Sequence, residues 1–214
     1  MDVASRVKNL PPYLFAEIEK KVENMRIQGK EVIDLGIGDP DLPTPEFIID
    51  RLCLEAKKAE NHRYPSYRGL SAFRKAAASW YTKRFGVTLN PDREVVSLIG
   101  SKEGIAHFAW CIVDPGDIVL ASDPGYPVYK ISTMLAGGIP LELPLLKKNQ
   151  FLPDFTSFPE SVLKRTKLIY INYPNNPTGA TVDHKFFREV VDLARTYDFV
   201  IAHDLAYSEV SYDG

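Results

Sequence analysis

INYPNNPTGA, residues 171–180, is the stretch of the sequence that decides the fold. It continues a run of strand-forming residues, 168–171, and places two asparagines and two prolines in the five positions 174–178. Proline fixes the backbone angle φ and asparagine side chains hydrogen-bond to nearby backbone, so the pattern predicts a rigid turn directly after a buried strand. Polar side chains in that place lie where open parallel sheets bind ligands, outside the carboxyl ends of the strands.

The flanking sequence alternates between apolar, strand-like segments and helical segments. Four segments are expected to be strands: residues 94–100, 117–122, 167–173 and 199–204, the last two buried. Helices are expected over residues 70–85, 102–113, 127–137 and 183–198, the last with Phe187, Val190, Val191 and Ala194 inward. Residues 139–145 are expected to form an edge strand, because proline cannot donate to a central ladder. The alternation predicts an α/β fold with a mostly parallel sheet sandwiched by helices.

Residues 1–40 are predicted to form an N-terminal arm, a segment separate from the alternating strands and helices. A helix with Leu14, Ile18, Val22 and Met25 on one face follows two prolines, and a short strand and a Gly/Pro-rich loop come after it. We expect this arm to pack against another part of the molecule. The chain stops directly after an expected strand, so we also expect it to be the N-terminal part of a longer polypeptide.

The composition excludes several classes of protein. The 214 residues are 45% hydrophobic with a net charge of −2, and the basic residues are spread along the chain, which argues against nucleic acid as a partner. No apolar run approaches the ~20 residues of a membrane span. The two cysteines and four histidines show no metal-ligand spacing. We therefore expect no metal, no membrane partner and a reduced, cytoplasmic location.

The carboxyl ends of the expected strands carry residues that suit a single ligand. In chain order these are Ser101, Lys102, Tyr126, Asn176, Asp204 and Tyr207. Taken singly, each has a plain structural interpretation, such as a helix cap, a packed tyrosine or a solvated loop acid. Together on one rim of one sheet they describe how a protein holds pyridoxal phosphate.

Each part of that cofactor has a matching group. The helix that begins near residue 101 offers backbone N–H groups and its dipole to a phosphate. Tyr126 offers a flat partner to the pyridine ring. Asp204 would keep the ring nitrogen protonated by ion pairing. Asn176 and Tyr207 would stabilise the phenolic oxygen as an anion.

With these residues the sequence resembles the class I and II aminotransferases, which are fold-type I enzymes that depend on pyridoxal phosphate. NNPTG at 175–179 is similar to the family's Asn-Pro-Thr-Gly motif, and DLAY at 204–207 to its Asp-x-Ala-Tyr motif. The resemblance covers essentially the whole chain. It implies that residues 1–40 belong in part to a smaller second domain, that residues 41–214 begin the large cofactor-binding domain, and that Asp204 and Tyr207 are catalytic.

The resemblance has further implications for the site. Tyr64 is implied to reach the phosphate of the neighbouring subunit, which implies a homodimer, and Gly36-Ile37-Gly38 to close over the substrate carboxylate. The family's Schiff-base lysine and its carboxylate-binding arginine are expected beyond residue 214. No lysine of this chain can replace the former, so the chain alone is expected to be inactive.

The sequences of three segments indicate which amino acid is the substrate. RYPSYRGLSAFRKAAASWY (63–81), GSKEGIAHFAW (100–110) and GYPVYKISTMLAGG (125–138) are most similar to LL-diaminopimelate aminotransferases. This implies LL-diaminopimelate and 2-oxoglutarate/glutamate as substrates, in lysine biosynthesis. Alanine-, aspartate- or aromatic-type aminotransferases and a fold-type I lyase stay open as alternatives. A dehydrogenase and a hydrolase are disfavoured, because GIGDP at 36–40 lacks the rest of the dinucleotide fingerprint and no G-x-S-x-G occurs.

Overall fold

The computed structural model describes residues 2–36, 38, 40, 42–210 and 212. The chain divides into two compact units, one of residues 11–98 and one of residues 1–10 together with 99–214. This division does not coincide with the predicted boundary between residues 40 and 41. The assignment of those two parts to a smaller and a larger domain stays a prediction.

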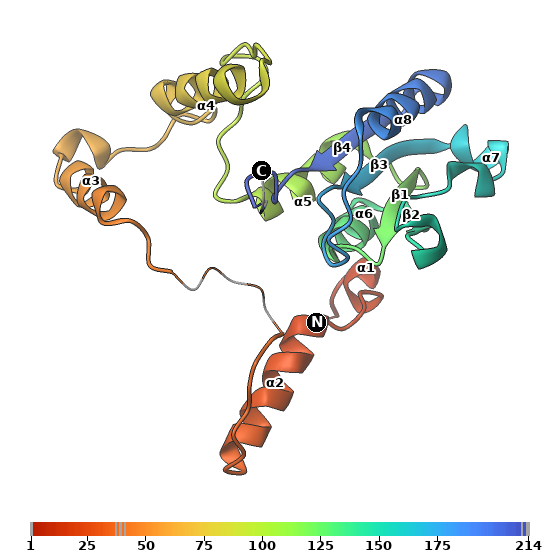
Figure 1. Cartoon of the computed structure of the whole chain (residues 1–214), viewed down its shortest axis with the longest axis horizontal. Coiled ribbons are helices and arrows are strands. Elements are labelled where there is room, and N and C mark those ends of the chain that lie inside the picture. The colour runs from red at the N-terminus through yellow and green to blue at the C-terminus, as the bar shows by residue number, and fades with distance from the viewer. Residues whose placement is uncertain (1, 37, 39, 41, 211, 213–214) are drawn as a thin grey trace. The chain divides into compact units, whose positions relative to one another are not determined.

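The larger unit is built on a four-stranded sheet in which all neighbouring strands are parallel (Figure 1). The strands follow the order β2-β1-β3-β4 and are β1 (Ile118–Asp123), β2 (Ile139–Pro144), β3 (Thr166–Asn172) and β4 (Val200–Asp204). The register sets Leu120 of β1 beside Leu141 of β2 and Ile169 of β3. The predicted α/β fold with a parallel sheet is therefore confirmed, and β2 is an edge strand as its prolines require.

Two predictions about the sheet are wrong. Residues 94–100 form no strand, and within them Val96 and Ile99 are 62% and 97% exposed. An apolar run becomes a strand only where a neighbour supplies the ladder of hydrogen bonds, and none of the four described strands pairs with it. The second error concerns β4, which was expected to be buried but is partly exposed, because within the described residues only β3 lies beside it.

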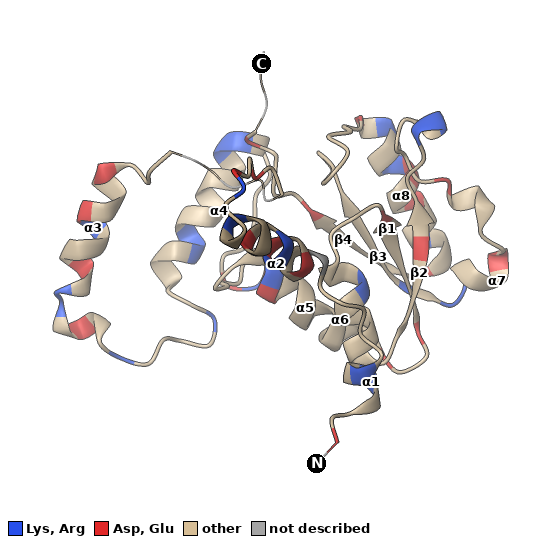
Figure 2. Cartoon of the chain, turned by 90° about the horizontal axis from the view of Figure 1, so that it is seen from below, with Lys and Arg blue, Asp and Glu red and all other residues tan. Residues whose placement is uncertain are grey.

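Helices cover both faces of the sheet, and the side chains of the central strands alternate between two cores. Facing α5 (Ser101–Ile112) and α6 (Val128–Ala136) are Val119, Ala121, Leu168 and Tyr170. Facing α7 (Glu160–Leu163) and α8 (His184–Tyr197) are Ile118, Leu120, Ile169 and Ile171. Figure 2 shows α5 and α6 on one side of the strands and α7 and α8 on the other.

Helix α8 shows how burial follows helical spacing. The Asp183 carboxylate accepts a hydrogen bond from the Phe186 backbone N–H at 3.0 Å and so caps the helix. Phe186 and Val190, four residues apart, are buried on the sheet. Val191, predicted to point inward, is 38% exposed, because one further residue turns the side chain by about 100° around the helix axis.

Short elements complete the larger unit: α1 (Ser5–Lys8), η2 (Lys147–Asn149) and η3 (Phe155–Ser157). Helix α6 ends at Gly137, whose φ of +88° lies in the region that favours glycine. A Cβ atom on the next residue, Gly138, would lie 2.5 Å from the Val113 side chain. The chain therefore passes close to the end of α5 before it enters β2.

The smaller unit is helical: α2 (Leu14–Ile27), α3 (Glu46–Ala56), η1 (Ala59–Asn61) and α4 (Ser71–Phe85). These include the helices predicted in the arm and over residues 70–85, whereas the short strand predicted after the arm helix is not formed by the described residues 31–36. Arg74 of α4 is buried, and its guanidinium donates to the carbonyl oxygens of Pro91 (2.9 Å) and Arg68 (3.1 Å) and to the Asp92 carboxylate (2.8 Å). These bonds tie the loops on either side of α4 to the helix.

Several large apolar side chains of the smaller unit are exposed. On α3, Phe47 and Leu52 are 74% and 68% exposed, and on α4 Phe73 and Trp80 are 57% and 43% exposed. Met25, on the apolar face predicted for the arm helix, is also exposed. Large apolar side chains that gather on an exposed face are typical of surfaces that associate with other protein surfaces. In the described parts of both units, no helix combines the length and apolar character that a membrane crossing requires.

Candidate active site

The site is centred on the ends of two neighbouring strands. Asn172 is the last residue of β3 and Asp204 the last of β4, and the register pairs them directly. The Asn172 side-chain Nδ2 donates to the Asp204 backbone carbonyl oxygen at 2.7 Å. The bond fixes the backbone of the predicted catalytic aspartate at the rim of the sheet, and the partly exposed Asp204 remains accessible to a ligand.

A buried tyrosine holds the side chain of Asp204. Tyr129, at the start of α6, is fully buried, and its hydroxyl donates to Asp204 Oδ2 at 2.7 Å. Its ring is stacked on that of Tyr170 of β3, with centroids 4.8 Å apart and an interplanar angle of 10°. Burial, and then the bond to Asp204, raise the pKa of the Tyr129 hydroxyl far above its ordinary value. The hydroxyl therefore stays protonated and remains a donor to the carboxylate.

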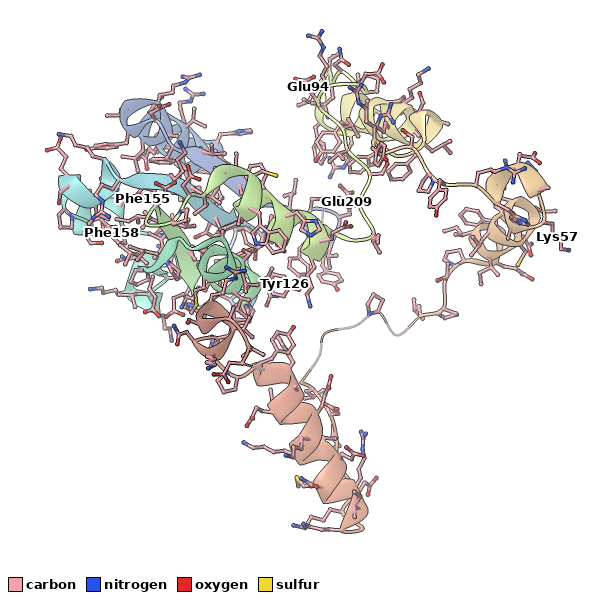
Figure 3. All side chains as sticks on the ribbon, turned by 180° about the vertical axis from the view of Figure 1, so that it is seen from behind. Lys57, Glu94, Tyr126, Phe155, Phe158 and Glu209 are labelled. Atoms are coloured by element: carbon pink, nitrogen blue, oxygen red, sulfur yellow. The ribbon has the colours of Figure 1, made fainter. Side chains whose placement is uncertain are left out.

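Lys102 and Tyr126 extend this group of contacts away from Asp204. The Lys102 Nζ lies 5.7 Å from the centroid of the Tyr126 ring, which is within the range of a cation–π contact. The Tyr126 ring in turn meets Tyr129 edge-on, with centroids 5.8 Å apart at 82°. Figure 3 labels Tyr126 beside the start of α6. Contacts therefore run from a cation, through two tyrosines, to a carboxylate.

The first turn of α5 lies beside that cation. Gly100 is the N-cap residue, and Ser101 and Lys102 are the first two residues of the helix. The Glu103 carboxylate accepts a hydrogen bond from the Ile99 backbone N–H at 2.7 Å, which fixes the chain where it enters the helix. The positive end of the helix dipole and the Lys102 ammonium are thus in one place, which favours an anion.

The turn after β3 is held by asparagines that the sequence reasoning did not single out. Asn172 Oδ1 accepts from the Asn176 backbone N–H at 2.6 Å. Asn175 is buried, and its Oδ1 accepts from the Thr178 hydroxyl at 2.6 Å while its backbone N–H donates to Ala180 at 2.9 Å. None of these bonds uses the Asn176 side-chain amide. Asn176 is therefore placed by its neighbours beside Asn172, on the same rim as Asp204.

The other predicted residues are less closely tied to this group. Tyr207 is exposed in the turn after β4 and is among the groups that raise the pKa of Tyr129. Tyr64, Gly36 and Gly38 belong to the smaller unit, and the Tyr64 side chain is fully exposed. The Gly36 N–H donates to Asp34 Oδ1 at 2.9 Å, and Ile37 lies outside the described residues. The roles of these five residues stay predictions.

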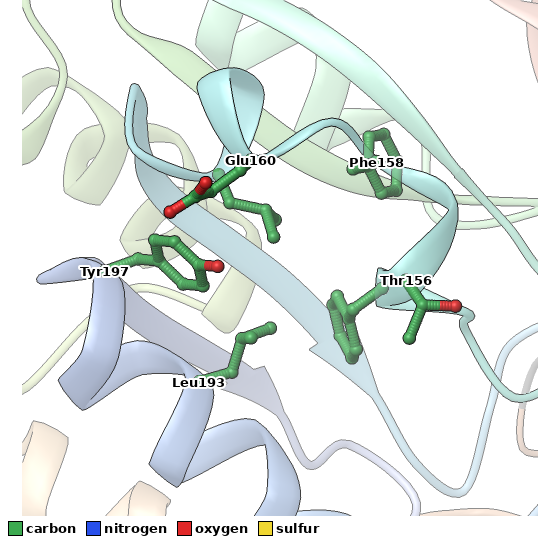
Figure 4. A pocket seen from close by; sticks show the side chains of 7 residues that line it. Thr156, Phe158, Glu160, Leu193 and Tyr197 are labelled. Atoms are coloured by element: carbon green, nitrogen blue, oxygen red, sulfur yellow. The ribbon is translucent and has the colours of Figure 1, made fainter.

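Two hollows in the larger unit are lined by residues outside this group of contacts. One, of about 250 Å³, lies between η3, α7 and α8, and Figure 4 shows Leu193 and Tyr197 on one side of it and Thr156 and Phe158 on the other. The second, of about 470 Å³, is lined by Tyr173, Pro174, Thr181, Val182, Phe187, His203 and Leu205. Neither lining includes a predicted site residue. No group of three potential metal ligands occurs among the residues that the structure describes.

The comparison with known proteins identifies the family. The model of the family "Aminotransferase class I and II" matches residues 30–214. This chain belongs to the class I and II aminotransferases. Enzymes of the family depend on pyridoxal phosphate, so the predicted family and its cofactor are confirmed.

Relatives of this aminotransferase chain agree with the assignment. It is 60% identical to the LL-diaminopimelate aminotransferase of Moorella thermoacetica over 100% of the chain and 55% of the relative. It is 58% identical to that of Desulforudis audaxviator over 99% and 54%. Among solved structures, alanine aminotransferase from Pyrococcus furiosus matches with a TM-score of 0.90 and 29% identity, over 100% of this chain and 54% of that one. The chain thus spans about half the length of the curated relatives it matches.

The residues at the rim fit the family's cofactor. A cation and a helix N-terminus lie at one end of the group of contacts and a fixed carboxylate at the other, with the Tyr126 ring between them. A phosphate ester of a protonated pyridine carries the complementary charges, with a negative phosphate at one end and a positive ring nitrogen at the other. Sequence reasoning missed Tyr129 and Asn172. The one sequence signal for Tyr129 is its spacing of three residues from Tyr126 at a helix start, and the place of Asn172 beside Asp204 follows only from the register of the strands.

Proposed function

We propose that the protein is a pyridoxal-phosphate-dependent aminotransferase that moves an amino group between an amino acid and a 2-oxo acid. The observation that carries the proposal is the Asp204 carboxylate held at 2.7 Å by a buried tyrosine, in contact through Tyr126 with Lys102. The substrates we propose are LL-diaminopimelate and the pair 2-oxoglutarate/glutamate, in lysine biosynthesis. The 51–60% identity to LL-diaminopimelate aminotransferases over almost the whole chain supports this choice.

The residues of this chain would divide the binding of the cofactor among them. Ser101, Lys102 and the N-terminus of α5 would hold the phosphate. Tyr126 would stack on the ring, and Asn176 and Tyr207 would hydrogen-bond the phenolic oxygen. When bound, pyridoxal phosphate supplies an electron sink for the carbon that carries the amino group.

Asp204 would hold the proton on the pyridine nitrogen. A carboxylate close to a cationic N–H favours its protonated form, and the effect is strongest where water is scarce. The carboxylate is well prepared for this role, because Tyr129 fixes its Oδ2 and Asn172 fixes its backbone. A fixed acceptor needs no reorganisation when charge develops on its partner.

We further propose a cytoplasmic homodimer in which Tyr64 reaches the phosphate of the neighbouring subunit. The exposed apolar side chains on α3 and α4 support an interface in the smaller unit. The loop at Gly36, Ile37 and Gly38 would close over the substrate carboxylate. Residues 1–40 would contribute to a smaller domain and residues 41–214 to the cofactor-binding domain, with the Schiff-base lysine supplied from beyond residue 214.

The experiment that tests the function uses the protein at its natural length, loaded with pyridoxal phosphate. LL-diaminopimelate and 2-oxoglutarate are supplied together and the glutamate formed is measured. Alanine, aspartate and phenylalanine are then assayed separately as alternative amino donors. The expected result is the highest kcat/KM for LL-diaminopimelate. A preference for another donor would replace the substrate assignment. Release of ammonia without a 2-oxo acid would indicate a lyase, and a failure to bind pyridoxal phosphate would overturn the proposal altogether.

A further inference from the structure

We propose that Tyr129 is a positioning residue that orients both protein groups expected to face the pyridine ring, the Asp204 carboxylate and the Tyr126 ring. This inference rests on the proposed function and deepens it, since it assigns a role that neither sequence motif contains. Tyr129 is suited to the role because it contacts both groups from inside the core, where its own position is fixed.

The first contact fixes the carboxylate. A carboxylate at the end of a strand can rotate about its Cβ–Cγ bond, and Asn172 restrains only the backbone of Asp204. The Tyr129 hydroxyl supplies the missing restraint through a charge-assisted bond of 2.7 Å to Oδ2. Because Oδ2 is engaged from the core side, Oδ1 is the oxygen available to the N–H of a ligand.

The second contact supports the stacking ring. Tyr126 meets the Tyr129 ring edge-on at 5.8 Å, an arrangement that aromatic pairs prefer. Tyr129 cannot move away from it, because its ring also lies flat against Tyr170. The Tyr170 hydroxyl in turn donates to the Ile105 carbonyl oxygen of α5 at 3.0 Å. Tyr129 is thus anchored to β3 and, through Tyr170, to the helix whose first turn carries Lys102.

The Tyr129 hydroxyl stays protonated, and so remains a hydrogen-bond donor, in neutral and alkaline solution. Burial and the neighbouring Asp204 both raise the pKa of the Tyr129 hydroxyl, so the bond to the carboxylate survives in neutral and alkaline solution. A water molecule in the same place would be free to leave or rotate. A tyrosine with a buried, stacked ring is not, which is why the hydroxyl can set a direction for the carboxylate and not merely solvate it.

Tyr129→Phe removes the hydroxyl and keeps the ring. Two ligands are titrated separately into the cofactor-free protein of natural length: pyridoxal phosphate, and its analogue with carbon in place of the ring nitrogen. The variant is expected to bind pyridoxal phosphate about ten- to a hundredfold more weakly than wild type, the effect of one hydrogen bond to a charged group. The analogue presents no N–H to Asp204, so its affinity is expected to stay within about twofold of the wild-type value.

Tyr173→Phe is the matched control. Tyr173 is also buried, and its hydroxyl donates to the Phe151 carbonyl oxygen at 2.8 Å in the core on the α8 side of the sheet. This variant is expected to leave both affinities unchanged. Tyr129→Leu, which also removes the edge contact with Tyr126, is expected to weaken binding of both ligands.

The outcomes distinguish a failure of the positioning role of Tyr129 from a failure of the proposed function on which that role rests. Equal losses for both ligands in Tyr129→Phe, or no loss for either, would overturn the positioning role while the wild-type protein still binds pyridoxal phosphate. A wild-type protein that binds neither ligand would overturn the proposed function, and the inference with it. If Tyr129→Phe does not fold, Tyr170→Phe releases the stacked ring from Ile105: a selective loss for pyridoxal phosphate supports the role, and unchanged affinities overturn it.

Discussion

Asn172 and Asp204 end neighbouring parallel strands in register, and the side-chain amide of the first donates to the backbone carbonyl of the second at 2.7 Å. The same asparagine accepts the Asn176 backbone N–H through Oδ1 at 2.6 Å. One buried side chain therefore links the strand end that carries Asp204 to the turn that carries Asn176. Two motifs that lie 28 residues apart along the chain are connected through a residue that belongs to neither.

Asn172→Ala is expected to destabilise the protein and weaken the cofactor site together. A partly buried acceptor on Asp204 and a partly buried donor on Asn176 each lose their partner, at up to about 1–3 kcal/mol apiece. The urea midpoint should fall with an unchanged m-value, and the Kd for pyridoxal phosphate should rise. Asn24→Ala, on an exposed position of α2, should change neither quantity. A wild-type urea midpoint in Asn172→Ala would contradict this account.

Asp204→Ala is expected to lower kcat by several orders of magnitude. The variant has no carboxylate to hold the proton on the pyridine nitrogen, and the Tyr129 hydroxyl is left buried without its acceptor. Asp192→Asn, on an exposed position of α8, serves as the control and should retain wild-type kcat. An Asp204→Ala enzyme that keeps more than about a tenth of wild-type kcat, roughly 1.4 kcal/mol of barrier, would remove Asp204 from the proposed role.

The sequence predicted the parts of the fold that depend on local pattern. The helix over residues 70–85, the strand around Ile169 and the edge position of the proline-containing strand all follow from spacing and from backbone chemistry. Residues 94–100 have the same apolar character but form no strand. Pairing is a property of the neighbour as much as of the segment, and no sequence pattern of one segment reveals it.

In the candidate site, too, some residues could be predicted from local sequence and others depend on neighbours in the folded chain. Lys102, Tyr126 and Asp204 were predicted from motifs, and the structure brings them into one set of contacts. Tyr129 and Asn172 were missed, because a tyrosine in a helix and an asparagine at a strand end have ordinary structural roles unless their partners are known. Their importance comes from register and side-chain direction, which appear only after the chain has folded.

Arg74→Met is expected to unfold the loops around α4. The buried guanidinium donates to Pro91, Arg68 and Asp92, and methionine fills a similar volume without satisfying these acceptors. The free energy of unfolding should fall by about 1–3 kcal/mol, the cost of leaving backbone acceptors unpaired, because the Asp92 side chain is 60% exposed and can be rehydrated. Lys75→Met, at the exposed neighbouring position, should leave thermal unfolding unchanged. Equal melting temperatures for the two variants would show that the buried network contributes nothing.

His203 is expected to make the fold sensitive to mild acid. Burial lowers the pKa of its imidazole, against the smaller opposing effect of its bond to the Tyr173 carbonyl oxygen at 3.0 Å. Below the ordinary histidine value of about 6.5, the unfolded chain takes up a proton that the folded chain does not, so stability falls as pH falls through that window.

Replacement of the histidine tests that assignment. His203→Gln should flatten the stability curve below about pH 6.5, the ordinary histidine pKa, in urea unfolding measured at a series of pH values. His107→Gln, at an exposed position of α5, should keep the wild-type slope. An unchanged slope in His203→Gln would assign the acid sensitivity to other groups.

A homodimer in which Tyr64 serves the neighbouring subunit has a distinctive signature in mixed dimers. Tyr64→Phe and Asp204→Asn each impair the site, and the natural-length protein is expected to sediment as a dimer at micromolar concentration. After equal amounts of the two variants are mixed and allowed to exchange subunits, each heterodimer contains one site with both native residues, built from the two chains. Half of the dimers are heterodimers, so activity should recover to about a quarter of wild type.

The recovery requires that Tyr64 and Asp204 of one site come from different chains. If both residues belonged to the same chain, every site in the mixture would keep one defect, and activity would stay at the average of the two variants. A mixture of Lys75→Met with Asp204→Asn is the control for mixing itself: it should give about half of wild-type activity with or without exchange, because every Lys75→Met chain retains an intact site whichever partner it has. Sedimentation as a monomer with cofactor bound would contradict the interface itself, independently of the mixing result.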